Sequence, residues 1–153
     1  MPTNAQKARA GGHLVVAELL RRGVGSVAFD DRRRSPEIVA CNSDASRTVT
    51  LRVKTKTTGD WQTTVELSEP REPDEDERRF WALVDIGTDP DQPPGYFIVP
   101  DWWMLNYIHE QYQSHLQRHG GTRPVSPGST HCAIRPADVE AWGGRWGALG
   151  LLT

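Results

Sequence analysis

The segment FWALVDI, at residues 80–86, constrains the fold more than any other because it is a nearly continuous apolar run. A short apolar run followed by turn-forming residues is typical of a strand buried at the centre of a sheet. The sequence GTDPDQPPG has turn composition and comes next, and YFIV at 96–99 is predicted to form a further strand. The chain is therefore expected to be built around a sheet.

Two long segments have the periodicity of amphipathic helices. Residues 4–22 carry apolar side chains at helical spacing and end before Gly23, a residue suited to a helix C-terminus. Residues 101–119 show the same spacing. The pair Gly11 and Gly12 is a flaw in the first helix, because each glycine costs about 1 kcal/mol relative to alanine.

Three further strands are predicted in the first third of the chain. VGSVAF (24–29) is a short strand, and EIVAC (37–41) is joined by the turn-like NSDAS to RTVTLRVKTK (47–56). The last two segments form the arms of an antiparallel hairpin. HCAI (131–134) is a short strand near the end. Helices and strands in this order predict an α/β or α+β layer, with one sheet flanked by the two long helices.

A chain of 153 residues is expected to form a single domain over residues 1–153. EPREPDEDER (69–78) is acidic and contains no apolar residue, which predicts a solvated loop and favours mobility. The loop predicted over 121–130 precedes a C-terminal segment, 131–153, which includes a short helix begun by Pro136. This last segment is expected to pack against the rest of the domain.

Charge is unevenly distributed, although the net charge is only −2. Residues 1–60 have five more basic than acidic side chains, and residues 61–153 have seven more acidic than basic ones. The N-terminal part is therefore the one suited to a polyanion. Cys41 and Cys132 stand alone, so no CxxC metal knuckle exists, and a reducing cytoplasm is the simplest location. No apolar run reaches the ~20 residues that a membrane span needs, and no membrane partner is expected.

Five segments occur in an informative order: GGHLVVAELLRRG, SPEIVA, LRVKTK, FWALVDI with YFIVP, and WGGRWGAL near the end. Together they resemble the PD-(D/E)XK nuclease superfamily, and are most similar to a small bacterial branch of nuclease-like and Holliday-junction-resolvase-like domains. The resemblance spans about residues 10–149. It implies a restriction-endonuclease-like α/β fold, with a mixed sheet between helices, and Mg²⁺-dependent cleavage of DNA. In many members it also implies a homodimer.

The resemblance assigns roles to two residues. Such a site holds Mg²⁺ with two or three carboxylates, so that the metal activates water and neutralises charge on the phosphate. A nearby lysine stabilises that charge. Lys54 matches the family's lysine. Glu37, after Pro36, matches the strand acid and would serve as a catalytic metal ligand.

Other positions depart from the family's pattern. The position two before the lysine, normally an acid, is Arg52, and a permanent cation cannot ligate a metal ion. The first helix has Gly12 where the family has an acid. Glu18, the only acid of that helix, points about 120° away but is retained as a second candidate metal ligand. Asp30 and Asp31 are further candidates, and we expect at best weak Mg²⁺ binding and poor cleavage.

Two interpretations remain open for the charged residues. Glu37 either holds a metal ion or forms an ion pair with Arg52 or Lys54, and these roles exclude each other. The cations expected to contact nucleic acid are Arg32, Arg33, Arg34, Arg52 and Lys56. Two classes of function follow. The chain is either a metal-dependent DNA endonuclease or a nuclease-derived module, without catalysis, that binds nucleic acid or another protein.

Overall fold

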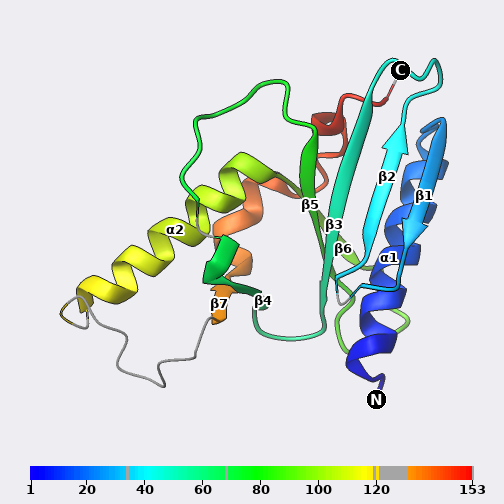
Figure 1. Ribbon diagram of the computed structural model, residues 1–153. Helices are drawn as coiled ribbons and strands as arrows, with labels where there is room; N and C mark the ends of the chain where they lie inside the picture. The colour runs from blue at the N-terminus through cyan, green and yellow to red at the C-terminus, as the bar shows by residue number, and fades with distance from the viewer. Residues whose placement is uncertain (34, 68, 119, 121–130, 153) are drawn as a thin grey trace.

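The computed structural model describes residues 1–33, 35–67, 69–118, 120 and 131–152. It shows a five-stranded sheet between two long helices, with a small second sheet beside one of them (Figure 1). The long helices are α1 (Asn4–Arg21) and α2 (Asp101–Arg118). The strands are β1 (Ser26–Asp30), β2 (Glu37–Cys41), β3 (Thr48–Lys56), β4 (Trp61–Thr64), β5 (Arg79–Asp85), β6 (Gly95–Pro100) and β7 (His131–Ile134). Three short 3₁₀ helices are η1 (Val65–Leu67), η2 (Pro136–Trp142) and η3 (Trp146–Leu149).

The main sheet is mixed, in the order β1-β2-β3-β5-β6. The predicted hairpin is confirmed, because β2 and β3 pair antiparallel with Glu37 opposite Arg52. β3 and β5 are parallel, and all other neighbours are antiparallel. The apolar run predicted as a central strand is β5, which lies between β3 and β6. The α/β class expected from the sequence is confirmed.

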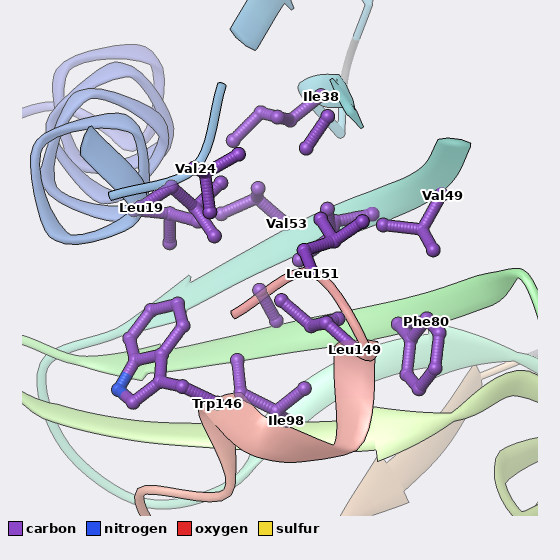
Figure 2. Close-up of a cluster of buried hydrophobic side chains, with 14 of the residues drawn as sticks. Leu19, Val24, Ile38, Val49, Val53, Phe80, Ile98, Trp146, Leu149 and Leu151 are labelled. Carbon is purple, nitrogen blue, oxygen red and sulfur yellow. The ribbon is translucent and has the colours of Figure 1, made fainter. Parts of the chain in front are cut away.

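Helix α1 covers one face of the sheet. Its Val15 and Leu19 are fully buried, against alternate residues of the strands. The C-terminal segment covers the same face, because η3 and the residues after it insert Trp146, Leu149 and Leu151 into this core (Figure 2). The packing role expected for the C-terminal segment is therefore seen in its described residues, up to 152.

The glycine pair in α1, which the sequence marks as a flaw, permits close packing. Gly11 and Gly12 are both buried. A Cβ atom on Gly11 would overlap with the side chain of Thr55 on β3, and one on Gly12 would overlap with the ring of Phe29 on β1. The absence of side chains at these two positions lets the helix axis approach the sheet, and this close packing offsets the low helix propensity of glycine.

On the opposite face, the described residues cover the part of the sheet formed by β5 and β6. Helix α2 packs there against β5 and β6, with Met104, Tyr107 and Ile108 buried. The two-stranded sheet β4–β7 completes this second core through Trp61, whose indole N–H donates to the carbonyl of Val84 at 3.0 Å. Strand β4 was not predicted. The first strand begins at Ser26 rather than at residue 24, and the loop predicted over 121–130 lies outside the described residues.

The acidic segment 69–78 is irregular, as predicted, but both its ends are attached to the domain. The backbone N–H of Arg71 donates to the side chain of Asn106 at 2.8 Å, and Asn106 returns a bond to the Arg71 carbonyl at 2.6 Å. Glu77 is buried, with 6% of its surface exposed. Glu77 therefore departs from the expectation of a fully solvated loop, whereas residues 72–76 are exposed.

Candidate nucleic-acid interface

The half of the sheet that α2 leaves uncovered forms an open face on β1, β2 and β3. Val39, at the middle of β2, has 42% of its surface exposed, and Ala28 beside it on β1 is exposed as well. Side chains alternate along β3, so Leu51 and Val53 enter the core below α1 while Arg52 and Lys54 point to the open face. Arg52 and Lys54 thus share one face, as the alternation of apolar and charged residues in LRVKTK predicts.

Strand register aligns charged residues in a row across this face. Asp30 of β1 lies opposite Glu37 of β2, which lies opposite Arg52 of β3, which lies beside Trp81 of β5. Lys54 lies two residues after Arg52 on β3, beside the buried Leu83 of β5. Glu37 and Lys54, the two residues to which the resemblance assigns roles, are thus on adjacent strands and on one face.

The structure gives Glu37 an ion-pair partner that the sequence did not suggest. Its carboxylate accepts a bond from Nη1 of Arg33 at 2.9 Å. Arg52 instead places its guanidinium carbon 5.0 Å from the centre of the Trp81 ring, in a cation–π contact. An ion pair between Glu37 and Arg52, one of the alternatives considered above, is therefore not formed.

A shallow pocket opens beside Arg52, at the border between the open face and the start of α2. Its lining comprises Glu37, Thr50, Arg52, Arg79, Phe80, Trp81 and Asp101. Asp101 accepts bonds from the Trp81 indole at 2.8 Å and from Arg71 at 3.2 Å. Both carboxylates of the pocket thus already contact an arginine. The guanidinium groups of Arg52 and Arg79 have no carboxylate partner among the residues that the structure describes.

Glu77 fixes the chain on the β5 side of this pocket. Its Oε1 accepts from the backbone N–H groups of Arg78 and Arg79, both at 3.1 Å. Its Oε2 accepts from Arg71 at 2.9 Å and from the N–H of Trp102, in the first turn of α2, at 3.1 Å. One buried carboxylate therefore ties the start of β5 to the start of α2. Sequence reasoning missed Glu77 and Asp101; the available signal was that each acid stands just before or at the start of a predicted element.

The arginines of the 30–36 loop reach the same face. Arg32 donates from its side chain to Asp30 at 3.0 Å, and with its backbone bond to the same carboxylate it lowers the pKa of Asp30 to about 2. Arg33 is the partner of Glu37. Arg34 lies outside the described residues. The loop thus brings two cations to the row, each beside one acid.

Lys56 and Glu18 lie away from the pocket. Lys56 is only 8% exposed, donates to Asp85 at 2.7 Å and lies 5.0 Å from the centre of the Trp61 ring. Its ammonium group therefore stabilises the domain rather than facing a ligand. Glu18 pairs with Arg21 and Arg22 at 2.9 and 3.4 Å on α1, so the sheet separates it from Glu37.

The donor set does not fit a magnesium ion. The described residues contain no group of three or more His, Cys, Asp or Glu side chains arranged to hold a metal. Glu37 and Asp101 are the acids of the pocket, and each is bonded to an arginine. Arg52 adds a fixed positive charge to the same pocket. Asp31, another candidate ligand, pairs with Arg9 at 3.3 Å. We therefore assign no chemical step to a metal.

Comparison of the chain with family models, with curated proteins and with solved structures gave no match. Among the described residues, neither long helix is apolar enough to cross a bilayer.

Proposed function

We propose that this chain is a nuclease-derived DNA-binding protein that binds the sugar-phosphate backbone through its open sheet face and does not cleave it. The observation that carries the proposal is the pair of guanidinium groups, Arg52 and Arg79, that lack a carboxylate partner in the described structure and line one pocket. Unneutralised arginines on a solvent-facing surface are the groups that polyanions recognise.

The restriction-endonuclease-like ancestry is part of the proposal. It is supported by the mixed sheet between α1 and α2 and by the placement of Glu37 directly opposite position 52, with Lys54 one pleat away. In the family that this sequence resembles, acids at 37 and 52 would hold a metal beside the lysine. Arg52 removes one of them. The fold alone does not define activity, and the residues of the site favour binding.

The charge of the open face agrees with this function. Its cations are Arg32, Arg33, Arg52, Lys54 and Arg79, and its acids are Asp30, Glu37 and, at the border with α2, Asp101. The excess of positive charge is local, since the whole chain has a net charge of −2. A local surplus of this kind directs a polyanion to one surface.

Fluorescence anisotropy with a labelled DNA duplex tests the proposal. The wild type should bind with an affinity that falls as salt rises, because bound cations are released from the phosphates. Arg79→Gln and Lys54→Gln should each weaken binding and reduce the slope of log affinity against log salt by about 1. Arg21→Gln, on the opposite face of the domain, is the matched control. Absence of binding at low salt would refute the proposal.

Plasmid nicking with Mg²⁺ or Mn²⁺ tests the alternative of an active endonuclease. We expect no metal-dependent nicking by the wild type. Nicking that is abolished by Lys54→Ala would instead identify an enzyme whose acids come from outside the pocket. Sedimentation velocity of the free protein and its DNA complex tests the homodimer that the resemblance implies.

A further inference from the structure

We infer that the pocket between β3, β5 and the start of α2 is a subsite for one internal phosphodiester group, clamped by Arg52 and Arg79. This inference rests on the proposed DNA-binding function and goes beyond it, because it names the position and the groups that hold the backbone in register. The remaining cations of the open face would then attract the DNA electrostatically without holding it in one position.

The two arginines converge because of the parallel pairing of β3 and β5. Thr50 lies beside Arg79, and Arg52 lies beside Trp81, so the two arginines belong to neighbouring rows on one face of the sheet. Both line the same pocket, as does Thr50, whose hydroxyl can donate a further bond. Planar guanidinium groups bind the oxygens of a phosphate in pairs, which an ammonium group cannot do.

The pocket holds the side chain of Arg52 and the backbone of Arg79 in place before a ligand arrives. Arg52 lies over Trp81, a ring that is 1% exposed and whose N–H is fixed by Asp101 at 2.8 Å. The backbone of Arg79 is fixed by the buried Glu77. Side chains that are already ordered lose less conformational freedom on binding, which increases affinity. Trp81 is therefore a positioning residue for Arg52.

The pocket offers an anion two guanidinium groups without a bonded carboxylate among the described residues. Glu37 is bonded to Arg33, and Asp101 shares Arg71 with the buried Glu77, so Arg52 and Arg79 are the lining cations that no described carboxylate engages. Because the neighbouring surface of β1 and β2 is open, a polymer backbone can pass across the pocket. These features suit an internal phosphodiester rather than a free phosphate ion.

Replacement of each arginine by lysine is the decisive experiment, since it keeps the charge and removes the planar fork. Binding is measured by anisotropy with a short duplex that has 5′-hydroxyl ends and therefore only internal phosphodiesters. We expect Arg52→Lys and Arg79→Lys each to weaken binding about tenfold, as for the loss of one charge-assisted hydrogen bond. Arg21→Lys, the matched control on α1, should leave affinity unchanged. Thermal unfolding confirms that each variant is folded.

A second readout locates the ligand. The Trp81 indole N–H signal in ¹⁵N-resolved NMR spectra should shift when the duplex is added, and inorganic phosphate at equal concentration should not shift it. Wild-type affinity in both lysine variants would overturn the clamp while leaving DNA binding intact. A shift with inorganic phosphate alone would assign the pocket to a free anion and overturn the choice of a phosphodiester. Absence of duplex binding by the wild type would refute the proposed function itself.

Discussion

The two faces of the main sheet differ in what covers them, and strand β3 shows the difference residue by residue. On one face Val49, Leu51 and Val53 are almost completely buried below α1 and the C-terminal segment. On the other, Arg52 and Lys54 are half-buried and border the solvent. The covered face accounts for stability, because it contains the larger apolar core. The open face is free to carry charge because α2 and the second sheet pack at its far end.

The comparison predicts that a charge introduced on the covered face strongly destabilises the protein. Gly12→Glu would place a Cβ atom in overlap with the ring of Phe29 and a carboxylate in the core. We expect a loss of more than about 3 kcal/mol of unfolding free energy, from overpacking and from burial of a charge. Chemical denaturation measures it, with Ala10→Glu on the exposed side of α1 as the control. A stable Gly12→Glu variant would show that α1 can move away from the sheet.

Neighbouring residues of β3 should respond in opposite ways. Leu51→Ala, which empties a fully buried site, is expected to cost about 2–5 kcal/mol of stability. Arg52→Ala removes a half-buried cation–π contact that contributes roughly 0.5–1 kcal/mol at exposed sites, yet it should abolish much of the DNA affinity. Denaturation and anisotropy on both variants check this. Equal losses of stability in the two variants would contradict the view that one face provides stability and the other binds DNA.

Glu77 ties the start of β5 to the start of α2 beside the pocket, so its removal should affect both stability and DNA binding. Glu77→Gln replaces a buried carboxylate that accepts four bonds, so we expect a loss of about 1–3 kcal/mol together with weaker DNA binding through a displaced Arg79. Glu75→Gln, an exposed change in the same segment, should alter neither quantity. Hydrogen exchange of the Arg78 and Arg79 amides reports the loosened segment; unchanged exchange would contradict the anchoring role.

The smallest expected effect is a loss of protein stability at acid pH, through the Asp30–Arg32 pair on the open face. Bonds from Arg32 lower the pKa of Asp30 from 3.8 to about 2. Because the folded value is the lower one, the pair stabilises the protein above about pH 3.8, and this contribution is lost as the pH falls towards 2. NMR titration of the Asp30 carboxyl should show the low midpoint, and Arg32→Gln should raise it. A midpoint near 3.8 in the wild type would mean that the pair is not formed in solution.

Local periodicity was enough to predict both long helices, the hairpin of β2 and β3, the central position of β5 and the shared face of Arg52 and Lys54. Each of these depends on spacing within a single segment or between adjacent ones. Strand β4 was missed because its sequence, WQTT, has one apolar residue in four, whereas its equally short partner β7, HCAI, is mostly apolar and was predicted. The role of the glycine pair was missed because the side chains that approach Gly11 and Gly12, Thr55 and Phe29, belong to other elements of the fold.

The candidate site was only partly predictable. The positions of Glu37, Arg52 and Lys54 on one face follow from strand pairing and alternation. The ion pair of Glu37 with Arg33 depends on the path of the loop before β2, and the bonds of Glu77 and Asp101 depend on how α2 docks beside β5. Local sequence periodicity gives no information about such contacts.

Almost half of the chain lies between β4 and β7, the two strands of the small sheet. Helix α1 and strands β1 to β3 are contiguous and local, so we expect them to assemble early, whereas closing so long a loop is slow. The small sheet and the Trp61 core would then form last, after the C-terminal residues have been synthesised. During translation α1 and β1 to β3 would therefore come together before η3 and the small sheet complete the two cores.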